Sequence, residues 1–242
     1  MSESILIEAG HLSKFYGSFR AIEDVSFQIR RGEVVAFLGP NGAGKSTTMK
    51  ILTGFLPPSS GRAFIAGFNM ERERLQGAQK LGYLPENGPL YPDMTPRESL
   101  AFFGRARGIS GRLLRGRIQR VVDICNLKSV LDKPIGKLSR GYRRRVGMAQ
   151  ALLHEPEALI LDEPTAGLDP NQIHDIRNTI RELSATKTIL LSTHVLQEVE
   201  AMAQRILFIA EGKLCFDGSV DKFLQGANSL EEKFRSLSKI SK

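Results

Sequence analysis

Cysteine is scarce in this 242-residue sequence, and long apolar runs are absent from it. The two cysteines, Cys125 and Cys215, form no CxxC or metal-ligand spacing, and we expect both to be small buried hydrophobes in a reducing compartment. No apolar segment approaches the ~20 residues that span a bilayer. The first residues lack the basic start and apolar core of a signal peptide. The sequence therefore predicts a soluble, cytoplasmic protein that reaches a membrane only through a partner or through surface charge.

Positive charge is in excess, with a formal net charge of +8. Arginines gather in two segments, 105–120 and 140–145. This pattern is compatible with nucleic-acid binding, with attraction to an anionic membrane face, or with a solvated helical surface. Few aromatic side chains that could stack on bases lie nearby, which disfavours nucleic acid. Charge alone does not separate the other two interpretations.

The segment 39–47, GPNGAGKST, is the most informative part of the chain. It follows the apolar run 34–38 and precedes 48–52, which has the character of a helix. Strand, glycine-rich loop, Lys-Ser and helix form the pattern that cradles phosphates with backbone N–H groups and a helix N-terminus. A glycine-rich turn with a chance Lys-Ser is the alternative, and the flanking elements disfavour it. We expect this loop to bind a nucleoside triphosphate through Gly39, Pro40, Asn41, Gly42, Ala43, Gly44, Lys45, Ser46 and Thr47.

Two further apolar runs, 158–161 and 188–191, have the character of strands buried on both faces. Polar side chains follow them, and the carboxyl ends of parallel strands are where ligands gather. Asp162 is suited to hold Mg²⁺, as is the Ser46 hydroxyl, and Glu163 can polarise or deprotonate a water. His194 can approach the γ-phosphate. Carboxylates that only solvate a turn and a structural histidine are the alternatives, which the phosphate loop disfavours.

In the rest of the chain, segments with the hydrophobic period of β-strands alternate with segments that have the period of α-helices. Alternation predicts half-buried strands around Ile5 to Ile7 and Val25 to Ile29. From about Thr95 to Asn126 the pattern is helical, with a capping residue and Pro96 at the first helical position. A turn at Glu211-Gly212 predicts a hairpin. Residues after about Gly226 are polar and amphipathic, and we expect a loosely attached helix there. We also expect a strand at 62–66 and helices at 142–153 and after Asp169-Pro170.

Taken in their order along the sequence, the motifs described above resemble those of the nucleotide-binding domain of ATP-binding cassette (ABC) transporters, and the resemblance covers essentially the whole chain. Residues 39–46 resemble the Walker A motif, 159–164 the Walker B motif with Glu163 as catalytic glutamate, and 166–169 the D-loop. His194 resembles the switch histidine. Tyr16 falls where the family places its adenine-stacking aromatic, and packing on the surface is the alternative.

Residues 138–142, LSRGY, resemble the LSGGQ signature that distinguishes this family from other P-loop ATPases. The resemblance implies that Ser139 and Gly141 meet the γ-phosphate held by another protomer. Arg140 and Tyr142 depart from the signature, and Glu86 stands where most members have a glutamine. A carboxylate is also a hard-metal ligand, so the implied Mg²⁺ ligands are Ser46, Glu86 and Asp162. The strings 83–86 and 89–91 resemble the subgroup that serves ABC-2-type exporters, including the gliding-motility ATPase.

The resemblance implies an α/β fold, with a RecA-like P-loop NTPase core, an N-terminal antiparallel β-subdomain and an inserted α-helical subdomain. The expected ATP-binding domain is 1–225, with the helical subdomain at about 87–154 and a C-terminal tail at 226–242. The implied catalytic residues are Glu163, His194 and Lys45, and the implied cofactors are ATP and Mg²⁺.

The implied function is that of the ATPase subunit of an exporter, peripheral on the inner face of the cell membrane. Its implied partners are integral membrane permease subunits on separate chains and a second ATPase subunit. A nucleic-acid ATPase, which usually carries long coiled coils or two fused cassettes, and a regulatory ATP-holding module are the alternatives. The transported substrate, and the choice between homodimer and heterodimer, stay open.

Overall fold

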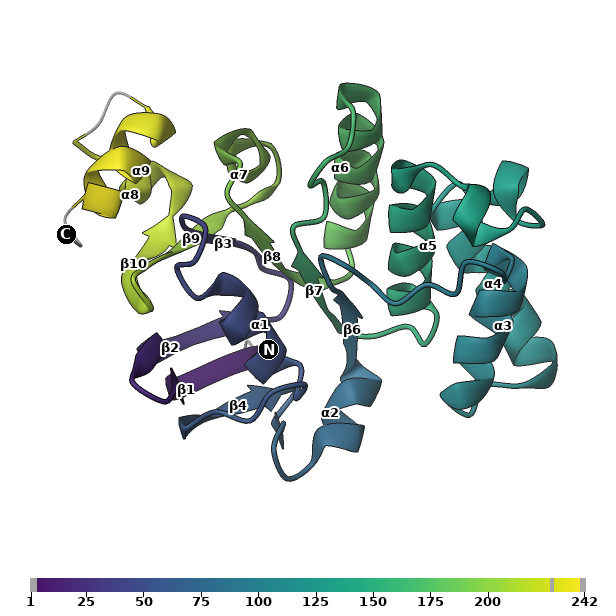
Figure 1. Cartoon of the computed structure of the whole chain (residues 1–242), viewed down its shortest axis with the longest axis horizontal. Coiled ribbons are helices and arrows are strands. Elements are labelled where there is room, and N and C mark those ends of the chain that lie inside the picture. Colours follow the sequence, from purple (N-terminus) through teal and green to yellow (C-terminus); the bar gives the residue numbers. More distant parts are fainter. Residues whose placement is uncertain (1–3, 227–228, 240–242) are drawn as a thin grey trace.

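Two β-sheets organise the computed structural model, which describes residues 4–226 and 229–239 (Figure 1). One sheet has four strands in the order β2-β1-β4-β5, and the other has six in the order β10-β9-β3-β8-β7-β6. The strands are β1 (Ile5–Tyr16), β2 (Phe19–Arg30), β3 (Val34–Leu38), β4 (Ser60–Ile65), β5 (Phe68–Asn69), β6 (Leu81–Leu84), β7 (Ala158–Asp162), β8 (Thr188–Thr193), β9 (Arg205–Ala210) and β10 (Lys213–Ser219). This architecture confirms the predicted fold class.

The four-stranded sheet is antiparallel and begins the chain. In β2 the buried residues Val25, Phe27 and Ile29 alternate with exposed ones, so one face covers the core and the other faces solvent. The Phe27 ring contacts the Phe37 ring of β3, with centroids 5.7 Å apart. The half-buried strand expected at Val25 to Ile29 is therefore confirmed, and it covers one side of the strand that leads into the phosphate loop. A strand is also present at Ile5 to Ile7, but without the expected alternation, because Ile5 is exposed and Leu6 and Ile7 are both buried.

The six-stranded sheet is parallel except at one edge, where β10 runs antiparallel to β9. All residues of β3, β7 and β8 are buried, as their continuous apolar runs predict. The turn between β9 and β10 is formed by Glu211 and Gly212, both at positive φ, which confirms the predicted hairpin. Because the inner strands are parallel, the loops that follow β3, β7 and β8 lie at the same edge of the sheet.

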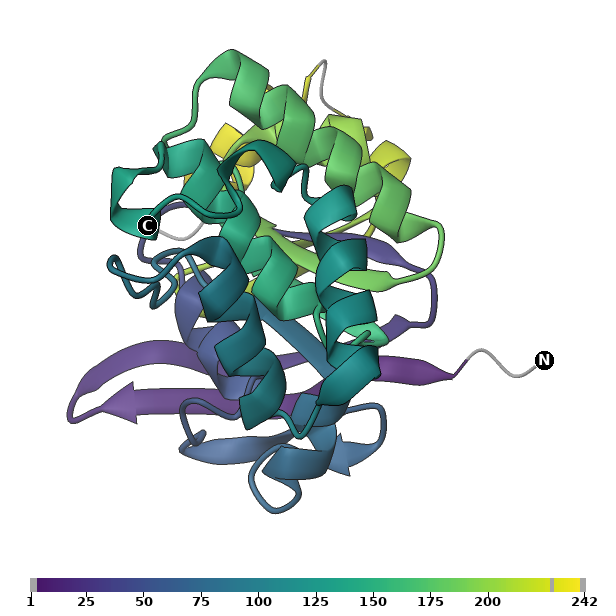
Figure 2. The same ribbon diagram turned by 90° about the vertical axis from the view of Figure 1, so that its right-hand side faces the viewer.

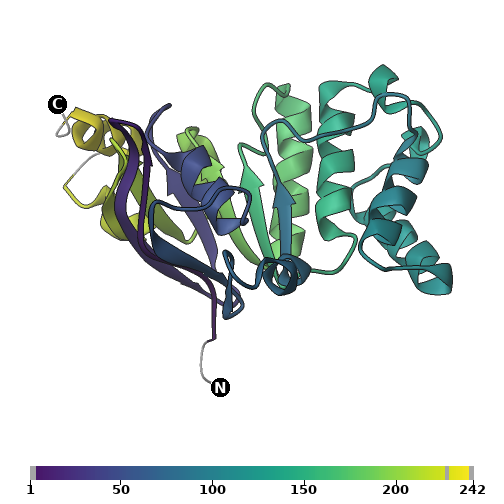
Figure 3. The same cartoon turned by 60° about the horizontal axis from the view of Figure 1, so that its bottom comes forward.

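Nine α-helices lie within the described residues: α1 (Lys45–Leu52), α2 (Arg74–Lys80), α3 (Pro96–Ala106), α4 (Gly111–Ile124), α5 (Arg140–Leu152), α6 (Pro170–Ser184), α7 (Leu196–Met202), α8 (Val220–Leu224) and α9 (Leu230–Lys239). Helices α3, α4 and α5 gather at one end of the molecule, beyond the edge strand β6 (Figures 2 and 3). Thr95 caps α3 in a capping box with Glu98, and Asp169 caps α6, as predicted. The predicted stretch at 95–126 consists of two helices, α3 and α4, separated at residues 107–110.

The chain also departs from the expectations at two places. Cys125 is buried, but Cys215 is exposed in the edge strand β10, so the prediction of burial was wrong for Cys215. Helix α9 is packed rather than loose, because Leu230 is buried and the Phe234 ring meets the Phe208 ring edge-on at 5.5 Å. Residues 227–228 and 240–242 of the expected tail lie outside the described residues. No helix in the described part of the chain is both long and apolar enough to cross a bilayer.

Candidate nucleotide-binding and catalytic site

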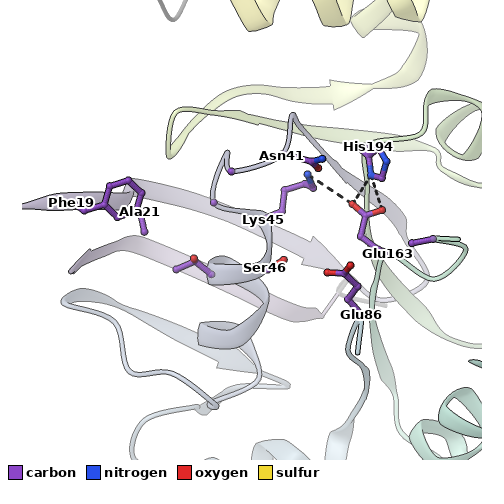
Figure 4. Close-up of a pocket in the computed structure, with 12 residues that line it drawn as sticks. Phe19, Ala21, Asn41, Lys45, Ser46, Glu86, Glu163 and His194 are labelled. Atoms are coloured by element: carbon purple, nitrogen blue, oxygen red, sulfur yellow. Dashed lines mark hydrogen bonds and ion pairs between the residues drawn. The ribbon is translucent and has the colours of Figure 1, made fainter. Parts of the chain in front are cut away.

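A cavity of about 480 Å³ opens at the carboxyl ends of β3, β7 and β8. Its walls come from the start of β2, the phosphate loop with the start of α1, and the loops after β6, β7 and β8 (Figure 4). The lining residues are Phe19, Ala21, Asn41, Gly42, Gly44, Lys45, Ser46, Thr47, Glu86, Glu163, Ala166 and His194. Segments distant in the sequence are thus joined around one cavity, as the strand-end argument predicted.

The phosphate loop needs glycine at two positions for steric reasons. A Cβ atom on Gly39 would lie 2.2 Å from the carbonyl oxygen of Ile209, in the neighbouring strand β9. Gly44 has φ 105°, and a Cβ there would lie 2.5 Å from the Ile22 side chain. Only glycine fits such close approaches and such a backbone. The loop is therefore clamped between β9 and β2, with Gly44 at the N-terminus of α1.

Lys45 is the first residue of α1 and its side chain is only 6% exposed. Its ammonium group donates to the carbonyl oxygens of Gly39 at 2.7 Å and Pro40 at 3.1 Å. Burial lowers the pKa of Lys45, and the nearby carboxylates of Glu163, Asp162 and Glu86 act in the opposite direction. A buried cation at a helix N-terminus, wrapped by loop amides, is suited to meet a polyphosphate.

Glu163 and His194 form a pair across the cavity from the phosphate loop. The Nδ1 atom of His194 lies 2.9 Å from one carboxylate oxygen of Glu163 and 3.0 Å from the other. The Lys45 ammonium nitrogen also lies near this pair, 3.9 Å from a carboxylate oxygen of Glu163 (Figure 4). A carboxylate held between a lysine and an imidazole at the edge of a water-accessible cavity is suited to orient and deprotonate a water.

The backbone of Glu163 is held in the left-handed region, at φ 48°. Its N–H lies 3.1 Å from the carbonyl oxygen of Ser192, and 3.1 Å from the Ser192 hydroxyl oxygen. The same hydroxyl donates to the Asp162 carboxylate. Strand β8 therefore fixes both acidic residues at the end of β7.

The oxygen ligands expected for Mg²⁺ are divided between the cavity wall and the protein behind it. Ser46 and Glu86 line the cavity, whereas Asp162 is 3% exposed and does not. No cluster of three or more His, Cys, Asp or Glu side chains with metal-binding geometry occurs in residues 4–226 and 229–239. This donor set fits Mg²⁺ bound beside phosphates, because that ion keeps several waters and uses one or two carboxylates with the substrate phosphates.

The aromatic side chain that lines this cavity belongs to Phe19, whereas the sequence indicated Tyr16. Tyr16 ends β1, is 51% exposed and does not line the cavity. Its cross-strand neighbour Phe19 does line it, on the side of the loop opposite Glu163 (Figure 4). The sequence reasoning missed Phe19, although its position three residues after Tyr16, across a Gly17-Ser18 turn, was a usable signal.

The signature residues lie away from the cavity. Ser139 is exposed and caps α5 by accepting a hydrogen bond from the Tyr142 N–H at 3.3 Å. Gly141 is buried, and a Cβ there would lie 2.5 Å from the Gln172 side chain of α6. Neither residue lines the cavity that contains Lys45. A single chain therefore does not bring the signature to its own phosphate loop.

Arg144 is a further residue that sequence reasoning missed. It lies on α5, and its guanidinium reaches carbonyl oxygens in the loops that follow β6 and β7. These are the loops that carry Glu86 and Glu163. No motif in the sequence singled out Arg144 among the arginines of 140–145.

Known proteins are similar to this chain over most of its length. The ABC transporter family matches residues 22–166. The linearmycin resistance ATP-binding protein LnrL of Bacillus subtilis (strain 168) is 34% identical over 215 residues, which cover 88% of this chain and 69% of that protein. The Nod factor export ATP-binding protein I of Paraburkholderia xenovorans (strain LB400) is 38% identical over 214 residues, covering 88% of this chain and 70% of that protein.

A solved structure described as the ATP-binding subunit of an ABC transporter is similar to the whole fold. It superposes with a TM-score of 0.86 and 33% sequence identity, covering 96% of this chain and 99% of the other.

Proposed function

The chain belongs to the ABC transporter family as an ATP-binding, ATP-hydrolysing cassette, and on that premise we propose that it powers export through separate membrane-spanning subunits. The observation that supports the hydrolytic role is the convergence of Lys45, Glu163 and His194 at one cavity. Support for export comes from relatives whose names refer to Nod factor export and to linearmycin resistance. The membrane subunits would place this protein on the inner face of the cell membrane.

The charged, polar and aromatic residues in and beside the cavity have the following roles in this proposal. Lys45 and the loop amides neutralise the outer phosphates. Ser46, Glu86 and Asp162 would hold Mg²⁺, which would neutralise charge on the phosphate oxygens. Glu163 takes the proton from the attacking water, and His194 orients the γ-phosphate end. Phe19, and Tyr16 beside it in the hairpin, are the aromatic rings available to the adenine base.

The proposal also requires a second ATPase subunit. Ser139 and Gly141 lie outside the cavity of their own chain. Ser139 is exposed and is available to the γ-phosphate bound by a partner, whereas Gly141 is buried next to the Gln172 side chain. The exposed position of Ser139, at the N-terminus of the 13-residue helix α5, supports this arrangement because such an N-terminus favours anions.

The helical subdomain is the proposed contact for the membrane subunits. A second cavity, of about 510 Å³, lies between the loop after β6 and helix α5. Close to it, the Tyr91 ring lies 5.9 Å from the Phe102 ring, and both side chains are roughly half exposed. Exposed aromatic rings beside a groove are typical of protein contacts.

Replacement of the proposed base tests the hydrolytic site. Glu163→Gln keeps the size of the side chain and removes its ability to accept a proton. Loss of a general base typically lowers turnover ~10²–10⁴-fold, so this variant should bind ATP, turn over very slowly and accumulate as an ATP-bound dimer. Steady-state phosphate release and size-exclusion chromatography with Mg-ATP measure both effects. Turnover equal to wild type would remove Glu163 from its role.

Capture from native membranes tests the role in transport. The tagged protein, solubilised from its own cells in mild detergent, should co-purify with a multi-spanning membrane protein in a defined ratio. Ser substituted for Phe102 should weaken that association while leaving ATP hydrolysis by the isolated protein unchanged. Recovery of the tagged protein only with nucleic acid or with soluble proteins would contradict the transport proposal.

A further inference from the structure

Arg144 makes an unusual set of contacts for one side chain. It is partly buried on α5, in the second turn after the cap residue Ser139. Each of its three guanidinium nitrogens donates to backbone carbonyl oxygens in two loops. The acceptors are Pro164 at 3.0 Å from Nε, Pro85 at 2.6 Å and Glu86 at 2.7 Å from Nη1, and Asp162 and, at 2.5 Å, Glu163 from Nη2.

These contacts require a guanidinium. Its planar fork carries five N–H donors on three nitrogens, whereas a lysine ammonium is a single point and the other cationic side chain, histidine, has two donors. Four of these carbonyl oxygens follow the ends of β6 and β7, and the fifth belongs to Asp162, the last residue of β7. Burial lowers the pKa of Arg144, and the carboxylates of Asp162 and Glu86 oppose that change. The side chain therefore stays a cation that links two loops.

The link has a fixed geometry on the helix side as well. A Cβ on Gly147, one turn after Arg144, would lie 2.9 Å from the Leu84 side chain, so α5 packs closely on β6. Ser139 caps the continuous helix that carries Arg144, and such a helix is a rigid element. A displacement of the N-terminal end of α5, at Ser139, is therefore transmitted by the Arg144 side chain to the loops that carry Glu86 and Glu163.

We propose that Arg144 is a positioning residue for ATP hydrolysis: by binding the carbonyls of both loops, it sets the places of Glu86 and Glu163 according to the position of helix α5. This inference rests on the roles proposed above for Glu163 and Glu86. Arg144 does not line the cavity at the phosphate loop, although it lines the second cavity, and none of its hydrogen bonds goes to Lys45. It therefore acts on the geometry of the reaction and not on the affinity for ATP.

Kinetics of two substitutions test the inference. Arg144→Met keeps the length and apolar stem and removes every donor, and Arg144→Lys keeps the charge on one nitrogen. A catalytic group displaced by ~1 Å can lose ~10²-fold in rate, so kcat of Arg144→Met should fall by about 10- to 100-fold, with Arg144→Lys between it and wild type. The KM for ATP should stay within about twofold of wild type, since the change affects the transition state and not ground-state binding.

The matched control is Arg115→Met, which removes an exposed arginine from α4. It should leave kcat and KM at wild-type values. Circular dichroism and thermal unfolding establish that each variant is folded. If Arg144→Met does not fold, Arg144→Lys alone decides, because a folded lysine variant with wild-type kcat overturns the inference.

Chemical rescue separates positioning from general loss of packing. Arg144→Ala leaves the carbonyl oxygens facing a space of guanidinium shape. Free guanidinium, well below denaturing concentrations, should restore part of the lost kcat, and urea or sodium chloride should not. Absence of rescue in a folded variant, or a loss confined to KM, overturns the positioning role.

The outcome also distinguishes this inference from the proposed function. If Glu163→Gln abolishes turnover while Arg144→Met and Arg144→Lys behave as wild type, the site assignment stands and the inference on Arg144 fails. If Glu163→Gln turns over normally, the site assignment fails first.

Discussion

At the scale of single residues, His154 is a half-buried base with an incomplete set of partners. Its Nε2 atom lies 3.0 Å from the carbonyl oxygen of Leu81, and its Nδ1 atom is buried without a hydrogen-bond partner in the described structure. Burial, together with the positive charges of Arg107, Arg117 and Lys187, lowers the pKa of His154 to about 4. The neutral imidazole is therefore the form that fits the fold.

Acid should destabilise the protein through this residue. The folded pKa of about 4 lies below the ordinary value of 6.5, so the unfolded chain binds the proton first as pH falls. The contribution of His154 is fully present above pH 6.5 and is lost progressively between pH 6.5 and 4. From pH 7 to pH 5 the free energy of unfolding should drop by about 2 kcal/mol on this account.

Urea unfolding of wild type and His154→Gln at both pH values checks this expectation. Glutamine keeps a donor for the Leu81 carbonyl and has no proton to gain in this range. Its loss of stability from pH 7 to pH 5 should be smaller than that of wild type by most of the His154 contribution. An identical drop in both proteins would assign the acid sensitivity to other groups.

The residues of the candidate site divide into those that sequence could indicate and those that it could not. Lys45, Glu163 and His194 each end or follow a recognisable strand, and parallel strands bring such ends together. The places of Phe19 and Arg144 at the site result from tertiary contacts, which the local sequence does not reveal. The carbonyls that Arg144 binds lie 18 to 59 positions away in the chain, and a carbonyl group leaves no trace in residue identity.

At the scale of elements, the strongest predictions were those with a local physical cause. The buried strands β3, β7 and β8 follow from continuous apolar runs, and helices α3 and α6 begin at a capping residue followed by proline. The cause lies within a few residues in each of these cases. The boundaries of the domain, of the helical subdomain and of the tail stay predictions.

Short elements and tertiary partners were beyond sequence reasoning. Strand β6 has four residues, including Gly82, which interrupts the apolar pattern. A Cβ on Gly82 would lie 2.4 Å from the Ala151 carbonyl oxygen, so glycine there permits the close approach of α5. Helix α9 has an evident apolar side, but that side alone does not reveal that Phe234 packs on Phe208 of β9. Packing of this kind is a property of the whole fold.

At the scale of the molecule, the separation of Ser139 from the cavity predicts that each working site is shared between two chains. Two inactive variants should then complement one another. Lys45→Ala removes the phosphate-binding cation. Ser139→Asp retains the capability to cap α5 and places a negative charge against the γ-phosphate of the partner.

Each variant alone should have little ATPase activity, and an equimolar mixture should regain it. In a symmetric two-chain assembly, random pairing gives one intact site in half of the dimers, or about a quarter of wild-type activity. Phosphate release as a function of mixing ratio measures this. A mixture as inactive as its components would indicate that each chain hydrolyses ATP with its own residues alone.

The left-handed backbone of Glu163 has a consequence for how this protein can change over time. A residue other than glycine held at φ 48° costs stability, of order 1–3 kcal/mol, and glycine at this position would relieve that cost while removing the carboxylate. A mutation to glycine that stabilises the fold at this position would therefore also remove the carboxylate needed for hydrolysis. Adaptation to heat would have to proceed at other positions, leaving this residue as a point where robustness and turnover are opposed.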